Sequence, residues 1–357
     1  MIFFCNFLSI INPHKNMTRQ GWMVILFLFT GVINATAQPV DSIAFFTDEK
    51  LLEATLVTDI RGLQNQKGED QFQEGDFTLR FPDSTVISEK IQVGARGNFR
   101  RGHCQIPPMM LNFRTPASPR LHTLGKLKLV LGCGTRSADE ELLLKEYLVY
   151  RIYNLLEEKS FRVRLLRISY RDTRNKVKPY TQYAFLIEDD ADMARRNGCR
   201  KKEHGQYLTE LTNRNTMTMV AIFQYMIGNT DWAVPNGHNV KLIFDRKDEN
   251  APPHVVPYDF DYCGLVNASY AVPHEIIGTS SVTERVYRGF PRSMEEIQWT
   301  LDLFRNKKDA ILSRVMDFNL LDERVRKGIR DYLNEFFRLI EDRGDVKSVF
   351  VDNARTS

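Results

Sequence analysis

The chain has 357 residues, of which 43% are hydrophobic and 26% are charged. These fractions exclude a disordered chain, a collagen-like repeat and a small disulfide-rich protein, and the length suffices for one large hydrophobic core or two modest ones. Lysine and arginine total 49 against 45 aspartate and glutamate residues, a formal charge of +4. This balance disfavours a nucleic acid as partner, because bulk attraction to a polyanion needs a strong positive excess.

The N-terminal segment predicts a secretory signal peptide over residues 1–37. The apolar run Trp22–Ile33 is too short to span a bilayer, Arg19 precedes it, and the small-residue pattern Ala-Thr-Ala at 35–37 follows at the distance expected for cleavage. A membrane anchor is the alternative interpretation. We therefore expect a secreted or periplasmic protein that keeps no stable transmembrane anchor after cleavage.

Four cysteines remain in the mature chain: Cys104, Cys133, Cys199 and Cys263. An even number of cysteines in a compartment that permits disulfides allows three pairings. Cys104 and Cys133 are the first candidate pair, and four separate buried thiols are the alternative. Zinc is not indicated, since no C-x-x-C occurs and His103, beside Cys104, lacks ligand spacing.

The residues that follow the signal peptide predict a β-rich lobe over 38–187. Within Phe77–Phe113, β-branched and aromatic residues are interrupted by Gly and Pro, which is typical of antiparallel strands. In the strand expected over 126–131, Lys126 and Lys128 lie on one face and the leucines lie on the other. Both lysines are candidates for contact with a ligand.

One long helix is expected within this lobe. The sequence Ser-Ala-Asp-Glu at 137–140 matches a capping box, and the apolar residues of Leu142–Leu156 cover almost the whole circumference, which predicts a largely buried helix. Two more strands are expected around 163–170 and 183–187. An acidic stretch at 188–190 then breaks the apolar pattern and marks a candidate hinge between two lobes.

A second, mostly helical lobe is predicted over 188–345, followed by a tail at 346–357. Thr216–Ile227 repeats apolar residues at helical spacing and predicts one helix. A helix that opens with a capping box at 293–296 and another that opens at Asp322 complete this lobe.

The segment 226–264 holds the residues with the clearest chemistry. It reads as the end of a helix, a loop with Asp231, the residue Asn239 before a strand, and a second strand that ends in Asp259 and Asp261. Oxygen ligands from separate elements suit a Mg²⁺ ion that also holds phosphates. Phosphoryl transfer needs an aspartate to orient a hydroxyl, an asparagine and an aspartate to hold metal, and a lysine for phosphate charge. All four residue types are present.

In this segment the chain resembles atypical protein-kinase-like proteins, especially the HipA-type and CotH-type kinases. The resemblance is carried by IGNTD at 227–231, HN at 238–239 and VPYDFD at 256–261, and it covers about a tenth of the chain. It implies an α+β, two-lobed protein-kinase-like fold, with an antiparallel-sheet N-terminal lobe that contains one main helix and a mostly helical C-terminal lobe.

The resemblance also implies roles for single residues. Asp231 matches the catalytic aspartate, Asn239 matches the metal-binding asparagine and Asp259 matches the metal-binding aspartate. Asp261 is a second metal ligand or a surface carboxylate beside the site. Asn236 competes with Asn239, because it stands five positions after Asp231, as the asparagine does in ordinary kinase loops. The loop between Asp231 and Asn239 is longer than the family pattern.

In the first lobe, the resemblance implies a strand lysine paired with a helix glutamate. Lys128 and Glu146 are the first choice for a pair with a catalytic role. Lys126 is the alternative lysine and a candidate cofactor contact, and Glu140 or Glu141 can replace Glu146. Either lysine is equally well interpreted as a solvated charge on an edge strand.

Three further residues are candidates for cofactor binding. No Walker A motif and no kinase-type G-x-G-x-x-G occurs, and the nearest feature is the turn 94–102, whose Arg96 and Arg100 offer bidentate contacts to phosphates. An ordinary exposed hairpin is the alternative interpretation of this turn. Glu188, at the candidate hinge, is the third residue.

The function expected is a secreted kinase-like phosphotransferase that uses ATP or another nucleotide triphosphate, with Mg²⁺ or Mn²⁺, to modify a hydroxyl of a protein or glycan in the cell envelope. AMP transfer is a variant at the same site. A kinase-shaped binding or scaffold protein without turnover is one alternative, and a metal-dependent hydrolase built on Asp259 and Asp261 is another. In the purely structural interpretation, Asp231 forms a turn and Asn239 is a cap.

Overall fold

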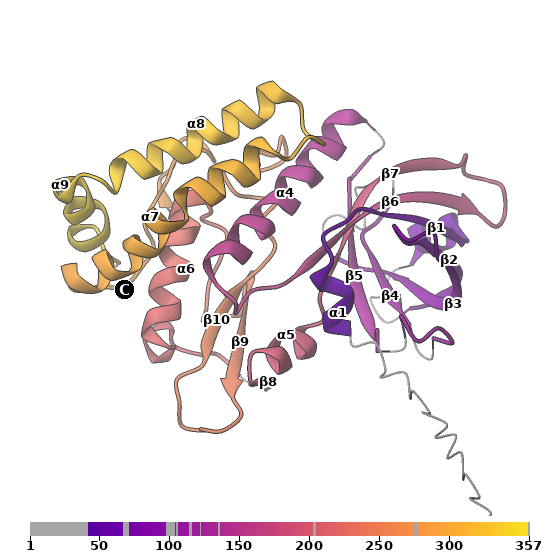
Figure 1. Cartoon of the computed structure of the whole chain (residues 1–357), viewed down its shortest axis with the longest axis horizontal. Coiled ribbons are helices and arrows are strands. Elements are labelled where there is room, and N and C mark those ends of the chain that lie inside the picture. The colour runs from indigo at the N-terminus through magenta and orange to yellow at the C-terminus, as the bar shows by residue number, and fades with distance from the viewer. Residues whose placement is uncertain are drawn as a thin grey trace, which may run out of the picture. The chain divides into compact units, whose positions relative to one another are not determined.

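Seven strands close into a barrel in this computed structural model (Figure 1). The structure describes residues 42–66, 71–97, 104, 106–113, 116–121, 123–134, 136–202, 205–273 and 277–355. The predicted signal peptide lies outside these ranges. Within them, no helix combines the length and the hydrophobicity needed to cross a membrane.

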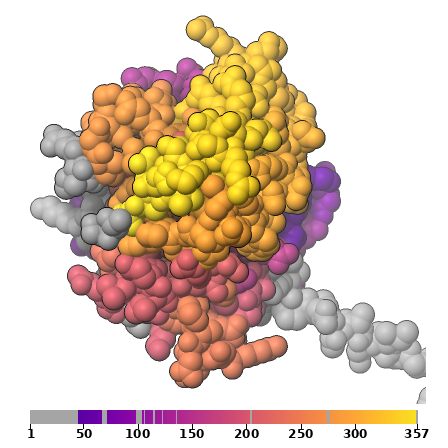
Figure 2. Space-filling view, turned by 90° about the vertical axis from the view of Figure 1, so that its left-hand side faces the viewer, coloured from indigo at the N-terminus to yellow at the C-terminus, as the bar shows by residue number. Residues whose placement is uncertain are grey.

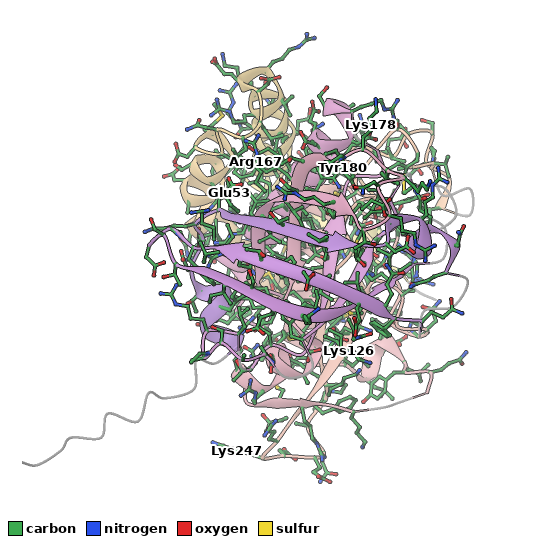
Figure 3. All side chains as sticks on the ribbon, turned by 90° about the vertical axis from the view of Figure 1, so that its right-hand side faces the viewer. Glu53, Lys126, Arg167, Lys178, Tyr180 and Lys247 are labelled. Carbon is green, nitrogen blue, oxygen red and sulfur yellow. A yellow bond between two sulfur atoms is a disulfide. The ribbon has the colours of Figure 1, made fainter. Side chains whose placement is uncertain are left out.

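The barrel has one parallel pair of strands, and its other neighbouring strands are antiparallel. The strands follow one another around the barrel in the order β1 (Leu52–Thr58), β2 (Gln73–Arg80), β3 (Val86–Ala95), β4 (Met109–Asn112), β5 (Lys126–Leu131), β7 (Tyr180–Ile187) and β6 (Val163–Asp172). The parallel pair is β1 and β6, with Leu52 opposite Leu166, and it joins the two ends of the sheet. Figure 3 shows the barrel strands from outside, with Glu53, Arg167 and Tyr180 upon them.

The closed barrel corrects the predicted fold class. The expected two-lobed protein-kinase-like fold with an antiparallel-sheet first lobe is wrong, because the sheet is mixed and closes on itself. Among the barrel strands, sequence reasoning missed β1, since the expected strands begin only at Phe77. Local pattern does not specify the partner of a strand, and β1 finds its parallel partner far along the chain.

Alternation along β5 divides its side chains between two hydrophobic cores. Leu127, Leu129 and Leu131 lie in the core of the barrel, whereas Val130 belongs to the core of the helical part. Lys128 shares the outward side with Val130, because side chains two positions apart point to the same face of a strand. The barrel wall therefore presents Lys128 toward the helical part.

The helical part packs around four long helices and a small antiparallel sheet (Figure 1). These elements are α4 (Ser137–Leu156), α6 (Arg214–Ile227), α7 (Met294–Met316), α8 (Glu323–Leu339) and the strands β8 (Cys199–Lys201), β9 (Val240–Asp245) and β10 (His254–Pro257). The predicted first-lobe helix is α4, and its buried residues belong to this core. Figure 2 shows α8 and the C-terminal residues over the end of the molecule that faces the viewer.

Shorter helices complete the described chain. They are α1 (Ser42–Thr47), α2 (Ile60–Asn65), α5 (Asp190–Arg196), the 3-10 helix Thr209–Leu211, α9 (Arg343–Lys347) and the π-helical turn Ser348–Asp352. In the last of these, Phe350 is fully buried and packs edge-on against Tyr225 and Tyr287. The C-terminal residues therefore contribute to the core of the helical part.

Capping signals in the sequence locate the helix starts to within a residue. The predicted box at the start of α7 is present, since the Ser293 backbone N–H donates to Glu296 Oε2 at 2.9 Å and the Glu296 N–H donates to Ser293 Oγ at 3.3 Å. At α4, Asp139 rather than Glu140 accepts a hydrogen bond from the residue before the helix, Arg136, at 3.3 Å. The sequence therefore predicted the start of α4 correctly, but the capping side chain is Asp139 and not Glu140.

A disulfide joins Cys104 to Cys133 and confirms the first candidate pair. Cys199 and Cys263 are buried free thiols. Burial raises the pKa of the Cys263 thiol to about 12, so this thiol stays protonated at physiological pH. The disulfide ties the segment before β4 to the segment after β5, within a single compact unit that spans Pro39–Ser357.

Candidate functional site

The loop that carries Asp231 is held from both sides. It begins at Gly228, which ends α6 with a φ of 66°, and a Cβ there would collide with the Tyr332 hydroxyl, so glycine is favoured at this position. Asn229 is 1% exposed and its side chain accepts a hydrogen bond from the Asp231 backbone N–H at 2.9 Å. The Trp232 indole N–H donates to the Asn229 carbonyl at 3.2 Å.

Arg288 fixes the same loop from the other side. Its guanidinium donates to the backbone carbonyls of Thr230 and Trp232, the residues on either side of Asp231, and it lies 5.2 Å from the centre of the Trp232 ring. Burial is the main reason why the pKa of Arg288 is lowered. These hydrogen bonds fix the backbone around Asp231 and do not involve its carboxylate.

Two neighbours contact the Asp231 carboxylate. His238 Nε2 lies 2.6 Å from Oδ1, and the Asn239 side-chain amide donates to Oδ2 at 3.0 Å and to the Asp231 carbonyl at 2.8 Å. Because the amide nitrogen of Asn239 faces Asp231, its amide oxygen points away and is available as a ligand. Asn239 is buried, with a φ of 53°.

Asp259 follows β10 and lies next to this cluster, because the Tyr258 backbone N–H donates to the Asn239 carbonyl at 3.0 Å. Its own backbone N–H donates to the hydroxyl of Tyr150, a fully buried residue of α4, at 2.8 Å. The φ of Asp259 is 62°, in the left-handed region. Among the described residues, none donates a hydrogen bond to the Asp259 carboxylate or pairs with it.

The side chains of Asp231, His238, Asn239 and Asp259 line one cavity of about 340 Å³. Its walls are formed by Arg96, Gly97, Pro108, Asp231, His238, Asn239, Asp259, Asp261, Tyr262 and Tyr270. The structure therefore brings together Asp231, the three predicted metal ligands and Arg96. Asp261 accepts a hydrogen bond from the Tyr270 hydroxyl at 2.9 Å.

Arg96 is the charged contribution of the barrel to this cavity. It follows β3, and its backbone N–H donates to the Pro108 carbonyl at 2.8 Å, which fixes the chain where it leaves the sheet. Within the described part of the chain, no carboxylate lies at ion-pair distance from its guanidinium. An arginine without an acidic partner at a cavity wall is suited to bind phosphate, because its donors form a bidentate fork.

Lys128 pairs with Asp190, and not with Glu146 as predicted. Lys128 Nζ lies 3.4 Å from one Asp190 oxygen, Lys241 Nζ lies 3.6 Å from the other, and both ammonium groups contact the Tyr258 ring, at 4.9 and 5.3 Å. Burial lowers the pKa of Lys128, and Asp190 partly offsets this effect. The outward face of β5 meets the start of α5, whereas buried Glu146 lines a separate small cavity.

The alternative glutamates are also engaged elsewhere, which removes them as partners of Lys128 in this structure. Glu140 accepts a hydrogen bond from the Tyr183 backbone N–H at 2.9 Å, and Glu141 pairs with Lys145 at 2.7 Å. The Glu140 contact ties α4 to β7, and the Glu141 pair lies within α4 itself.

Three predicted cofactor contacts lie away from the 340 Å³ cavity or outside the described residues. Lys126 is exposed at the start of β5, with Nζ 5.5 Å from the Phe72 ring (Figure 3). Glu188 is buried and pairs with Arg196 at 2.9 Å, so its carboxylate has a structural role. Arg100 falls outside the residues that the structure describes.

Sequence reasoning gave no role to His238, which makes the shortest of these contacts to Asp231. The chain returns to Asp231 through an isolated bridge between Ala233 and His238. The signal was present in Pro-Asn-Gly at 235–237, since these residues favour a tight turn that reverses the chain.

The donors fit a hard divalent cation. They are the Asn239 amide oxygen and the carboxylates of Asp259 and Asp261, and Mg²⁺ prefers oxygen ligands. In the described ranges, no group of three or more His, Cys, Asp or Glu side chains is arranged to hold a metal by itself. Proteins commonly bind Mg²⁺ through one or two carboxylates together with substrate phosphates, so this donor set suits a cation that arrives with a nucleotide.

No protein-family model matches the chain, and no curated protein matches it significantly. The function is therefore inferred from the site itself.

Proposed function

We propose that the protein is a secreted or periplasmic phosphotransferase. It uses ATP or another nucleotide triphosphate, with Mg²⁺ or Mn²⁺, to modify a hydroxyl of a protein or glycan in the cell envelope. The observation that carries this proposal is that one cavity is lined by Asp231 and Asn239 from the loop between α6 and β9, by Asp259 after β10 and by Arg96 after β3. The local resemblance to HipA-type and CotH-type kinases in sequence supports the same chemistry.

In this proposal Asp231 positions the acceptor hydroxyl and takes its proton. The hydroxyl oxygen attacks the γ-phosphorus, the bond from that phosphorus to the bridging oxygen breaks, ADP leaves, and the hydroxyl proton passes to the Asp231 carboxylate. His238 and Asn239 hold this carboxylate in one orientation through their contacts at 2.6 and 3.0 Å. A fixed orientation matters because positioning supplies much of the rate in phosphoryl transfer.

The remaining groups bind the nucleotide phosphates. Asn239 and Asp259 would hold the divalent cation, which when bound would supply positive charge to neutralise the phosphates. Arg96 donates to phosphate oxygens from the barrel side of the cavity. Tyr262 and Tyr270 close the wall beside Asp261 and reduce the access of water to the reacting groups.

The first test measures binding by thermal shift on the protein that begins at Gln38. We expect ATP with Mg²⁺ or Mn²⁺ to raise the melting temperature of the wild type but not of Asp259→Asn, because that change removes a metal ligand. Asp309→Asn is the matched control, since Asp309 is exposed on α7 and far from the site in the sequence. Absence of any shift in the wild type would contradict the proposal.

The second test measures transfer from ATP labelled in the γ-phosphate to envelope proteins and glycans. Asp231→Asn should keep the thermal shift and lose roughly 10²-fold or more of the labelling rate, as expected for a lost proton acceptor. Equal labelling by the wild type and Asp231→Asn would remove Asp231 from the reaction. Labelling from the α-phosphate alone would assign AMP transfer to the same site.

A binding or scaffold protein without turnover is the second candidate function. It is favoured by one observation, that both oxygens of the Asp231 carboxylate already have partners. A nucleotide-dependent thermal shift without any labelled product would select this candidate over the phosphotransferase.

A further inference from the structure

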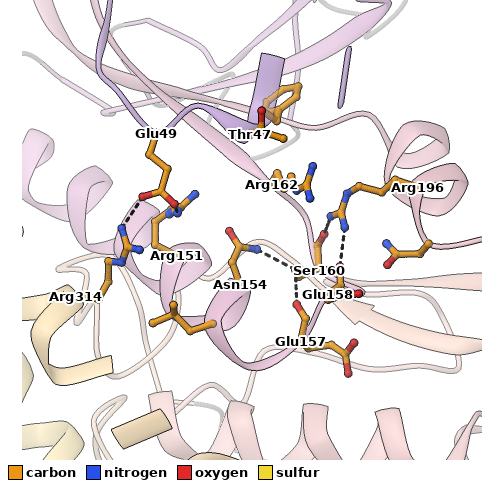
Figure 4. A pocket seen from close by; sticks show the side chains of 13 residues that line it. Thr47, Glu49, Arg151, Asn154, Glu157, Glu158, Ser160, Arg162, Arg196 and Arg314 are labelled. Atoms are coloured by element: carbon orange, nitrogen blue, oxygen red, sulfur yellow. Dashed lines mark hydrogen bonds and ion pairs between the residues drawn. The ribbon is translucent and has the colours of Figure 1, made fainter. Parts of the chain in front are cut away.

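A second and larger cavity, of about 490 Å³, shares no residue with the candidate functional site (Figure 4). It lies between the segment before β1, the C-terminal half of α4, the start of β6, α5 and α7. The residues that line it are Phe46, Thr47, Glu49, Arg151, Asn154, Leu155, Glu157, Glu158, Ser160, Arg162, Arg196, Asn197 and Arg314. We call it the arginine cavity.

Four arginines from four separate segments of the chain line this cavity (Figure 4). Arg151 and Arg314 share one carboxylate, that of Glu49, which lies 2.7 Å from Arg314. Arg196 pairs with Glu188 at 2.9 Å and also donates to the Glu158 carbonyl at 2.8 Å. The side chains of Arg151 and Arg196 are only 8% and 9% exposed, so their charges are largely removed from water.

The side chain of Arg162 takes no part in these ion pairs. Its backbone N–H donates to Glu188, but among the described residues no carboxylate lies at ion-pair distance from its guanidinium. Burial and the neighbouring charge of Arg196 lower the pKa of Arg162, and the carboxylates of Glu188 and Glu158 partly offset this effect. An anion beside Arg162 would give its guanidinium the charged partner that it lacks among the described residues.

Three polar atoms in the same wall are buried without a hydrogen-bond partner among the residues that the structure describes. They are Nη1 of Arg162, Nε of Arg151 and Oδ1 of Asn154. A buried polar atom without a partner is unfavourable, and three around one cavity form a site whose hydrogen bonds are incomplete. A small shift of these side chains onto a ligand would complete them.

We propose that the arginine cavity binds a small hydroxylated anion, a sugar-sized molecule that carries one carboxylate or phosphate group, with Arg162 as the main charged contact. Guanidinium groups bind both kinds of anion in a bidentate manner. Glu157 and Glu158 line the same cavity and offer acceptors for hydroxyl groups. The volume is in the range of small-molecule sites. This proposal is independent of the phosphotransferase proposal.

The test is calorimetric titration of the protein that begins at Gln38, at constant ionic strength, with three probes. Glucose 6-phosphate and glucuronate present the two anionic groups, and glucose is the neutral control. We expect the wild type to bind at least one anionic probe and not glucose. Arg162→Gln should lower that affinity about tenfold or more, because it removes a charged hydrogen bond.

Arg167→Gln is the matched control, since Arg167 is exposed on the outside of the barrel (Figure 3) and should leave the affinity unchanged. Circular dichroism confirms that each variant is folded. If the variant Arg162→Gln does not fold, Arg314→Gln replaces it, because that side chain is 33% exposed. No binding of either anion by the wild type, or equal binding by the wild type and the folded arginine variant, would overturn the proposal.

Discussion

Asn239 and Asp259 both adopt left-handed backbone conformations, with φ angles of 53° and 62°. Residues with a Cβ avoid this region, and asparagine and aspartate tolerate it better than most because their short side chains make local hydrogen bonds. These two of the proposed metal ligands are thus the residue types that the backbone accepts most readily there after glycine. Chemistry and conformation favour the same side chains at these positions.

This coincidence predicts an unusual order of stability at position 259. Asp259→Gly should be about 1 kcal/mol more stable than Asp259→Ala, because glycine accepts a positive φ and alanine does not. Urea unfolding measures both variants. At position 309, in the middle of α7, the same pair should give the opposite order, with alanine more stable by about 1 kcal/mol. Equal stabilities at position 259 would show that its conformation changes readily.

The candidate site was predictable where its residues follow one another closely in the sequence. The sequence identified Asp231, Asn239 and Asp259 because a helix end, a loop and two strands follow one another around them. The partner of Lys128 was not predictable, because Asp190 reaches it through the pairing of β5 with β7, which sets Lys128 opposite Ile187, three residues before Asp190. Side chains from distant segments meet according to tertiary packing, which local spacing does not encode.

At the scale of single elements, helices were easier to predict than strands. The apolar period of α6 and the capping box of α7 identify each helix from its own residues, since helical hydrogen bonds stay within one segment. The strand β1 has the alternating burial of a barrel strand, but its partners β2 and β6 come later in the chain. Closure of the barrel depends on that distant pairing and could not be derived from short patterns.

The start of α7 is also where the structure predicts a dependence on pH. The hydrogen bond from Arg214, whose Nη2 lies 2.8 Å from Glu296 Oε2, lowers the pKa of Glu296 from 4.5 to about 2. A carboxyl group with a lowered pKa stabilises the fold above its unfolded pKa and loses this contribution as the pH falls through its folded pKa. The loss therefore falls between a pH of about 4.5 and a pH of about 2.

Glu296→Gln should remove this part of the pH dependence. The difference in unfolding free energy between the wild type and the variant should be largest near neutral pH and should shrink as the pH falls below 4.5, the unfolded value. Urea unfolding over a series of pH values measures it. Glu341→Gln, at an exposed position after α8, serves as the control. A difference that does not change with pH would contradict the assignment.

At the scale of the whole molecule, the barrel and the helical part are joined by common strands and not by a simple linker. The strands β5 and β7 contribute alternate residues to both hydrophobic cores, as Leu129 and Val130 do on β5. The cavity at Asp231 and the arginine cavity are each lined by residues from both sides of this boundary. A change in the packing of the barrel is therefore expected to alter both cavities.

The disulfide Cys104–Cys133 stabilises the barrel side of this arrangement. Its two cysteines are 29 residues apart, and cross-linking a loop of that length reduces the entropy of the unfolded chain by an amount worth about 3–4 kcal/mol. Replacing both cysteines with alanine should lower the free energy of unfolding by about that amount, as measured in urea without reductant. The reduced wild type should behave like the double variant, and a double variant as stable as the oxidised wild type would contradict this prediction.

The parallel pairing of β1 with β6 also bears on how the chain is made. Leu52 pairs with Leu166, so β1 leaves the ribosome well before its parallel partner β6 has been made. Until then β1 is an edge strand with unpaired backbone donors and acceptors, which can pair with other extended chains. Production of this protein should therefore depend on chaperones that shield nascent segments.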